Sequence, residues 1–187
     1  VTLPLKPLAV GRKLYVANYA FVSVFNLKNL KLLAKWGGKG QAAESLNLAS
    51  GLAVAANKDI YVVDLGNLRL KKLSPQGKVK WIFGQPYNSR NAIGRQFGLP
   101  VSAALDGKYI YVVDAFNSEI VALNSDRQVL ARLGKVGDSE GELYYPAGIA
   151  YGGQQIFAVA DKFNDRVQLL KIQLNKSRKA KSNVKFN

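Results

Sequence analysis

Ile60-Tyr61-Val62-Val63-Asp64 occurs again fifty residues later, with the same five residues, as Ile110–Asp114. Leu14–Asn18 and Phe157–Asp161 repeat the pattern of apolar, β-branched and aromatic residues that closes on a short polar side chain. Such runs favour β-strands. The closing residues are 46, 50 and 47 positions apart, close to the ~40–50 residues of a four-stranded propeller blade. The sequence therefore predicts one such strand in each of four repeated sheets.

The segments that flank these four cores repeat as well. A short apolar run precedes each core, and a polar turn and another short run follow it. In the first three copies a fourth run ends in an aromatic residue or Leu followed by Gly. Short runs separated by turn residues predict an antiparallel four-stranded meander, and no sustained helical period competes with it. The preceding runs are Leu8–Val10, Gly51–Val54, Ser102–Leu105 and Gly148–Tyr151; the following runs are Val22–Leu27, Leu68–Leu73, Ile120–Leu123 and Arg166–Ile172; the fourth runs end at Trp36-Gly37, Phe83-Gly84 and Leu133-Gly134.

The connection between the third and fourth copies is more specific. Leu133–Gly141 (LGKVGDSEG) leads to Pro146–Ala150, and the stretch resembles the Gly-rich connection between blades of the NHL-repeat family. Ile60–Arg69 and Val159–Val167 are similar to that family's second and third strands with their hairpin. The resemblance covers about residues 5–174. It implies an all-β fold, a β-propeller of about four NHL-like four-stranded blades.

The number of blades leaves two arrangements open. NHL propellers usually have six blades, so the chain is either a four-bladed ring or part of a larger six-bladed propeller. A ring needs an outer strand for the fourth blade, which Val1–Leu5 could supply, because Pro4 fits only an edge strand. The expected organisation is a propeller over residues 1–174, with blades at about 5–44, 48–97, 99–145 and 146–174, and a basic tail over 175–187.

The net charge of +15 is unevenly distributed. Residues 1–43 hold seven Lys or Arg and no Asp or Glu, residues 98–170 hold six against nine, and residues 171–187 hold six against none. This pattern favours an acidic protein or other polyanion as a partner, with RNA as an alternative. General solubility is the competing explanation. The candidate partner-binding residues are Lys35, Lys39, Lys78, Lys80, Arg90, Arg95, Lys176, Arg178, Lys179 and Lys181.

Two of the candidate lysines, Lys35 and Lys80, directly precede a tryptophan. Trp36 and Trp81 follow lysines in the matching fourth runs of the first two copies. Aromatic side chains beside cations can stack on nucleic-acid bases, but we expect these two to pack between blades. Gln85–Gly98 is the longest connection between copies and hence the candidate recognition loop.

An Asp-x-x-Asn motif closes three of the four cores. We interpret it as structural, because an Asp at a strand end can accept backbone N–H groups of the following turn and Asn tolerates the left-handed conformation. Arg69 and Arg166 are close enough in sequence to pair with these aspartates. A repeated metal site is the alternative interpretation. The motif comprises Asp64 and Asn67, Asp114 and Asn117, and Asp161 and Asn164.

The residues that are absent argue against catalysis. The chain has no His, Cys or Met, which removes the commonest general base and the commonest metal ligand. Only Asp106 directly follows one of the expected first strands, and Asp106-Gly107 reads as a turn. The sequence therefore predicts no enzyme activity, no metal and no cofactor. The expected function is a non-catalytic interaction scaffold that binds an acidic macromolecule or assembly through a basic surface; an NHL-type RNA-binding propeller and a lyase-like or lactonase-like enzyme are the alternatives.

Membrane and compartment signals are sparse. No apolar run approaches the ~20 residues of a membrane-spanning helix. The absence of an initiator Met is compatible with removal of a signal peptide, which favours an extracytoplasmic location: periplasmic, secreted or at the cell surface. Assembly into a larger complex is compatible with the sequence, which leaves the oligomeric state open.

Overall fold

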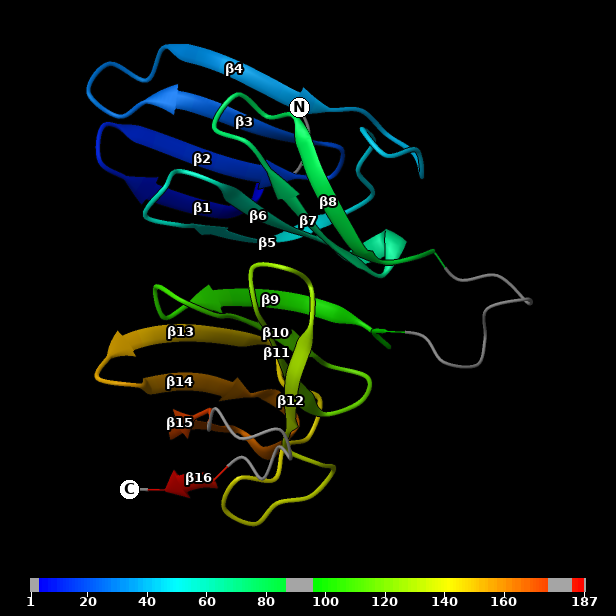
Figure 1. Cartoon of the computed structure of the whole chain (residues 1–187), viewed down its shortest axis with the longest axis vertical. Coiled ribbons are helices and arrows are strands. Elements are labelled where there is room, and N and C mark those ends of the chain that lie inside the picture. The colour runs from blue at the N-terminus through cyan, green and yellow to red at the C-terminus, as the bar shows by residue number, and fades with distance from the viewer. Residues whose placement is uncertain (1–3, 87–95, 175–182, 187) are drawn as a thin grey trace. The chain divides into compact units, whose positions relative to one another are not determined.

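The structure is a computed structural model that describes residues 4–86, 96–174 and 183–186, the last of these as backbone. It contains four antiparallel sheets of four strands, and consecutive strands of the chain are neighbours in every sheet (Figure 1). Two sheets lie in each of two compact units, Val1–Phe97 and Gly98–Asn187. The predicted all-β fold with four four-stranded sheets is confirmed.

The first unit holds the first and second sheets. In both, the predicted apolar core is the second strand, and the runs around it form the first, third and fourth strands. The first sheet is β1 (Pro4–Val10), β2 (Lys13–Asn18), β3 (Phe21–Asn26) and β4 (Leu32–Gly37); the second is β5 (Ala49–Val54), β6 (Ile60–Asp64), β7 (Arg69–Leu73) and β8 (Val79–Gly84).

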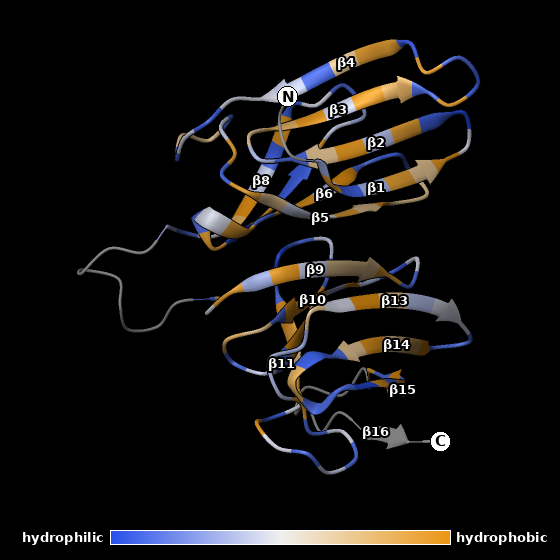
Figure 2. Cartoon of the chain, turned by 180° about the vertical axis from the view of Figure 1, so that it is seen from behind, coloured by the Kyte–Doolittle hydropathy of each residue, from blue (hydrophilic) through white to orange (hydrophobic). Residues whose placement is uncertain are grey.

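Alternation along the strands determines which side chains form the core of this unit. Tyr15 and Ala17 on β2 are buried, and they pair with Val24 and Val22 of β3 on the same face. These residues share one hydrophobic cluster with apolar residues of the second sheet, including Ile60. Figure 2 shows the resulting concentration of apolar residues on the strands. The two sheets of the unit are therefore held together by a common apolar core.

The second unit repeats this organisation with the third and fourth sheets. Tyr111 of the third sheet packs against Phe157 of the fourth, with ring centroids 4.4 Å apart. Both belong to a single cluster of buried residues from the two sheets. The third sheet is β9 (Pro100–Leu105), β10 (Ile110–Asp114), β11 (Glu119–Leu123) and β12 (Val129–Leu133); the fourth is β13 (Gly148–Gly153), β14 (Ile156–Asp161), β15 (Arg166–Gln173) and β16 (Asn183–Phe186).

The outer strand of the fourth sheet differs from the one expected from the sequence. β16 pairs with β15, and Asn183–Phe186 lies within the segment expected to be a basic tail. Pro4 and Leu5, considered as an outer strand for this sheet, instead belong to β1, where Pro4 pairs with Asn18.

The glycine-rich connections within each unit have the same construction. Gly37 and Gly134 follow the fourth strands in the left-handed region, at φ +108° and +93°. A Cβ on Gly37 would lie 2.7 Å from the carbonyl oxygen of Ala20. Leu46 and Leu143, which come later in these connections, are each fully buried in the core of their own unit. The repeated Gly is thus required by backbone conformation and by close approach to a neighbouring turn.

Candidate functional site

Asp64 is the centre of a buried polar network in the first unit. Its carboxylate accepts hydrogen bonds from the backbone nitrogen of Asn47 (2.7 Å), from Arg69 Nε (2.7 Å) and from Asn67 Nδ2 (2.9 Å). The guanidinium of Arg69 also donates to three carbonyl oxygens of the connection that leads into the second sheet. The network therefore fastens that connection to its sheet. Those carbonyls belong to Gln41, Ala42 and Ser45.

The two equivalent aspartates of the second unit, Asp114 and Asp161, also accept hydrogen bonds from the backbone of the connection that precedes their sheet. Asp114 accepts from the backbone nitrogens of Gly98 and Leu99, each at 2.7 Å. Asp161 accepts from the backbone nitrogen of Tyr144 at 2.7 Å and from Arg166 Nε at 2.9 Å. Burial raises the pKa of Asp161, but these hydrogen bonds outweigh it and hold the pKa below its ordinary value. Within the described part of the chain, no three carboxylates are close enough to hold a metal ion.

This geometry differs in two details from the turn expected from the sequence. The main backbone donors to the three aspartates come from the preceding connection, although Asp114 also accepts weakly from Asn117 N of its own turn, at 3.4 Å. Asn18 in the first copy accepts from its own turn, from Phe21 N at 2.8 Å. The left-handed residues are those after the asparagines: Leu68, Ser118 and Asp165. Two asparagine amides reach back to carbonyl oxygens of the same connections, Asn67 to Gly40 and Asn164 to Gly137.

Lys71 extends the network of the first unit and has a neutral counterpart in the second. Its side chain is 1% exposed, and Nζ donates to the carbonyl oxygens of Ala43, at 2.5 Å, and Ser45. Gln168 stands at the same place relative to Asp161 and donates to the carbonyl oxygen of Glu142 at 2.7 Å. Burial lowers the pKa of Lys71 to about 8, and the charge of Arg69 acts in the same direction.

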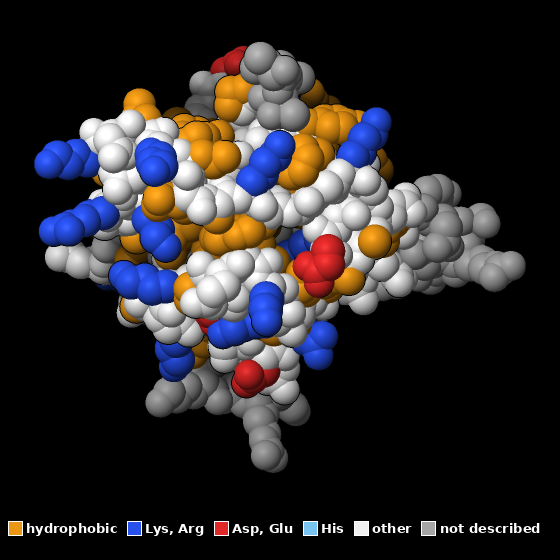
Figure 3. Space-filling model, turned by 90° about the horizontal axis from the view of Figure 1, so that it is seen from above, with side chains coloured by type: hydrophobic (Ala, Val, Ile, Leu, Met, Phe, Trp, Pro, Cys, Tyr) orange, Lys and Arg blue, Asp and Glu red, His pale blue; other side chains and the backbone are white. Residues whose placement is uncertain are grey.

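Most of the surface charge of the first unit is positive. Residues 4–86 hold thirteen Lys or Arg and three Asp or Glu. Of these three carboxylates, Asp59 and Asp64 are buried and paired with cations, so Glu44 is the exposed one within the described residues of this unit. Figure 3 shows Lys and Arg side chains around one face of the molecule, with apolar side chains between them. The exposed cations are Arg12, Lys13, Lys28, Lys31, Lys35, Lys39, Lys58, Lys78 and Lys80, which we call the basic surface.

The predicted partner-binding lysines fall into two groups. Lys35 Nζ stands 3.7 Å from the ring centroid of Phe21, Lys39 Nζ stands 5.4 Å from that of Tyr19, and Lys78 is exposed in the turn between β7 and β8. Lys80, by contrast, forms an ion pair with buried Asp59 at 2.6 Å, although its side chain is 44% exposed. The other predicted residues, Arg90, Arg95, Lys176, Arg178, Lys179 and Lys181, lie outside the described residues, as does most of the candidate loop 85–98.

Both tryptophans are used in packing. Trp36 contacts Tyr15 with ring centroids 6.3 Å apart, and it lies directly over Gly77 of the second sheet. Trp81 packs edge-to-face on Tyr61 at 5.7 Å. Trp36 therefore packs between two sheets, as the sequence predicted, whereas the ring contact of Trp81 is with Tyr61 of its own sheet.

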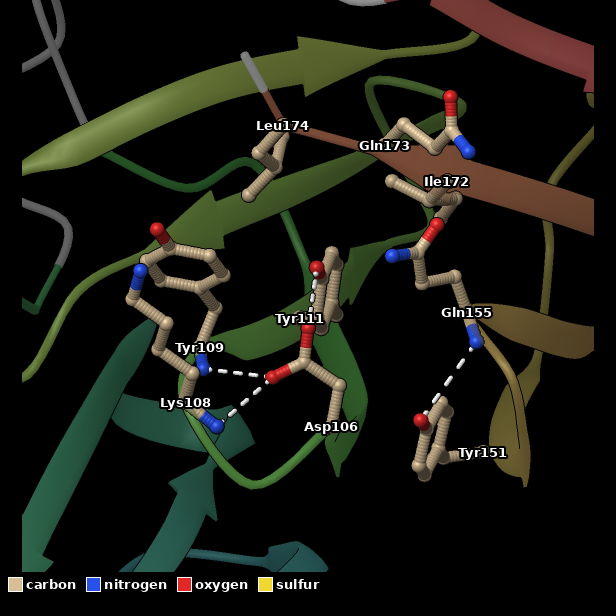
Figure 4. A pocket seen from close by; sticks show the side chains of 9 residues that line it. All are labelled: Asp106, Lys108, Tyr109, Tyr111, Tyr151, Gln155, Ile172, Gln173 and Leu174. Carbon is tan, nitrogen blue, oxygen red and sulfur yellow. Dashed lines mark hydrogen bonds between the residues drawn. The ribbon is translucent and has the colours of Figure 1, made fainter. Parts of the chain in front are cut away.

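The sequence did not point to a hollow in the second unit. Its volume is about 460 Å³, and it lies beside the turns that join β9 to β10 and β13 to β14 (Figure 4). The Asp106 carboxylate accepts hydrogen bonds from the backbone nitrogens of Lys108 (2.8 Å) and Tyr109 (2.7 Å) and from the hydroxyl of Tyr111 (2.8 Å). Asp106 thus makes the predicted turn and also faces the hollow. The other lining residues are Tyr151, Gln155, Ile172, Gln173 and Leu174.

The hollow is lined by ionisable groups of three kinds: the Asp106 carboxylate, tyrosine phenols and the Lys108 ammonium group. Burial raises the pKa of Tyr111, and the hydrogen bond to Asp106 raises it further, so the phenol stays protonated and donates. Lys108 Nζ stands 4.8 Å from the ring centroid of Tyr109. A carboxylate, a phenol and an ammonium group beside aromatic rings are suited to hold a small polar molecule.

The paired sheets, their Gly-rich connections and the repeated Asp networks define a β-propeller protein, and comparison with solved structures agrees. A protein of unknown function from Bacteroides thetaiotaomicron is similar with a TM-score of 0.65 and 20% identity, over 83% of this chain and 43% of that one. A streptogramin B lyase is similar with a TM-score of 0.67 and 10% identity, over 96% of this chain and 52% of that one. Virginiamycin B lyase from Staphylococcus aureus is similar with a TM-score of 0.59 and 12% identity, over 98% of this chain and 69% of that one.

These similarities establish the propeller fold and nothing finer. The chain spans about half the length of the first two structures. No protein-family profile matches the sequence. No curated protein matches it either. None of the helices in the described part of the chain is both long and apolar enough to cross a membrane.

The prediction that the chain is not an enzyme is wrong. Two of the similar structures are named as lyases, so the fold is one that propeller enzymes use. The absence of His removes imidazole as an acid or base, but carboxylates, phenols and amines serve the same purpose. The hollow beside Asp106 is lined by all three kinds of group: one carboxylate, one amine and the phenols of three tyrosines.

Proposed function

We propose that this chain is an NHL-like propeller domain that binds an acidic macromolecule or assembly through the basic surface of its first unit. The observation that carries the proposal is the charge of that surface: nine exposed cations against one exposed carboxylate, Glu44, among the described residues. A surface of one sign steers an oppositely charged partner and holds it by displacing its counterions.

The composition of the basic surface argues against RNA as the partner. Eight of its nine cations are lysines, which act as flexible point charges and lack the planar fork with which Arg reads phosphates and bases. The indoles of Trp36 and Trp81 are engaged by Tyr15 and Tyr61, whereas single-stranded RNA is bound by stacking its bases on open aromatic faces. Arg90, Arg95 and the basic residues of 175–187 raise the net positive charge of the chain further.

The test is the salt dependence of binding to polyglutamate and to polyuridylic acid. In the Lys35→Ser/Lys39→Ser variant, the slope of log K against log salt should fall by about 1 to 2, since each lost contact removes ~0.7–0.9. Lys108→Ser/Lys162→Ser in the second unit is the matched control, because these lysines also stand over aromatic rings. Its slope should equal that of the native protein.

Four results would count against the proposal or redirect it. Salt-independent binding, or no binding to either polymer, would contradict it. Equal slopes for the two double variants would show that the second unit, or charge in general, is responsible. Much tighter binding to polyuridylic acid than to polyglutamate of equal charge would favour the RNA alternative.

A further inference from the structure

The turn between β3 and β4 exposes leucines among its cations. Leu27 is 42% exposed, Leu30 63%, and Leu32 and Leu33 are 50% exposed each. Lys28 and Lys31 alternate with them, and both are exposed. We call Leu27–Leu33 the leucine–lysine turn; it lies at one end of the first sheet (Figure 1). Clustered exposed apolar side chains of this size commonly mark an interaction site.

The fold does not require leucine at this turn. Asn26 Oδ1 caps the turn by accepting from Lys28 N at 2.9 Å and Asn29 N at 3.4 Å. Ser74 and Asn124 cap the equivalent turns of the second and third sheets in the same way. Those turns, Ser74–Lys78 and Asn124–Gln128, contain no leucine. Leu27 and Leu30 are therefore additions to a turn that forms without them.

A basic hollow lies beside the leucine–lysine turn. It has a volume of about 460 Å³ and is lined by Gly11, Arg12, Asn26, Leu27 and Lys28. The backbone nitrogen of Leu27 donates to the carbonyl oxygen of Arg12 at 2.9 Å, which fixes the two turns side by side. Residues 1–43 contain no Asp or Glu, so no carboxylate from this sheet neutralises the hollow.

We propose that the leucine–lysine turn docks on the surface of an anionic phospholipid bilayer. This inference rests on the proposed function and identifies the acidic partner as a lipid surface. A phospholipid offers a phosphate to Arg12 and Lys28 and acyl chains to Leu27 and Leu30 within one molecule. A soluble polyanion would satisfy the cations and leave the leucines in water. Interfacial segments with basic and apolar side chains bind anionic membranes by these two contributions together.

The experiment is co-sedimentation with vesicles of phosphatidylcholine alone and with about one third phosphatidylserine. The native protein should bind the second kind and lose binding as salt rises. Leu27→Ser/Leu30→Asn should weaken this binding at least about tenfold, since two leucines leave the acyl boundary. It should leave binding to polyglutamate unchanged. Asn adopts the left-handed conformation that Leu30 has at φ +56°, so the turn is preserved.

Two further variants complete the test. Phe116→Ser/Val136→Ser removes apolar side chains that are 66% and 63% exposed in the second unit, and it should bind vesicles like the native protein. Lys28→Ser/Lys31→Ser should weaken binding to both vesicles and polyglutamate. Native-like vesicle binding by the leucine variant would overturn lipid docking and leave the proposed function standing. So would binding to polyglutamate without binding to vesicles, or equal binding to both kinds of vesicle. Absence of binding to every acidic probe would overturn both proposals.

Discussion

Replacing Asp64 with Ala should destabilise the first unit by about 3–5 kcal/mol, the range for removing one partner of a buried ion pair. Asp64 is fully buried and the side chain of Arg69 is 5% exposed, so the guanidinium would stay buried without its counter-charge. The backbone nitrogen of Asn47 would lose its acceptor as well. Both tryptophans of the chain are in this unit, so urea unfolding followed by tryptophan fluorescence measures the loss.

Asp161→Ala in the second unit is the matched comparison. Arg166 pairs with Asp161 at 2.9 Å, but its side chain is 31% exposed, so water can hydrate the guanidinium once the carboxylate is gone. The expected loss is about 1–3 kcal/mol, mainly from unpaired donors such as Tyr144 N. Hydrogen exchange of the amides on β14 and β15 reports the stability of this unit. A loss at Asp64 no larger than the loss at Asp161 would contradict the role of the buried charge.

The four sheets could be predicted from the sequence because burial demands a repeated local pattern. A run such as Ile60–Asp64 must be apolar to enter a core, and its spacing to Ile110–Asp114 reflects a sheet of fixed size. The Asp networks could be predicted only in part. Asp64 is seen to bond with Asn47 N, 17 residues upstream, whereas turn chemistry considers only the residues that follow. Which connection returns to the aspartate is a property of the assembled unit.

The candidate sites were harder to predict for the same reason. Leu68–Leu73 is predicted as a strand, but only the structure shows that every residue of β7 is buried, its three basic residues included. The leucines of the β3–β4 turn read as the ends of two amphipathic strands, and only the structure shows that Leu30 is 63% exposed. The hollow beside Asp106 combines two turns and the end of β15, three segments that no sequence motif connects.

Lys71 should make the first unit more stable as the pH rises from about 8 to 10.5. Its pKa falls from 10.5 to about 8 because burial and the charge of Arg69 disfavour the ammonium form. Between these two pH values the unfolded chain binds the proton and the folded chain has released it, so the free energy of unfolding increases with pH. The increase is up to about 3 kcal/mol, from 1.36 kcal/mol per pKa unit.

The neutral amine can keep the contacts that the ammonium makes. It retains two N–H groups, enough for the carbonyl oxygens of Ala43 and Ser45. Deprotonation therefore removes a buried charge without leaving an acceptor unpaired.

Lys71→Gln isolates this effect from the other groups that titrate at high pH. Gln168 shows that a neutral amide fits the equivalent position and reaches the carbonyl oxygen of Glu142. The stability of the native protein minus that of Lys71→Gln should rise by up to about 3 kcal/mol between pH 8 and 10.5 and stay constant below pH 7. Urea unfolding of both proteins, followed by tryptophan fluorescence across that range, gives the difference directly. A difference that does not change with pH would show that Lys71 stays charged in the folded protein, held by the two carbonyl oxygens and by Asp64, 3.9 Å away.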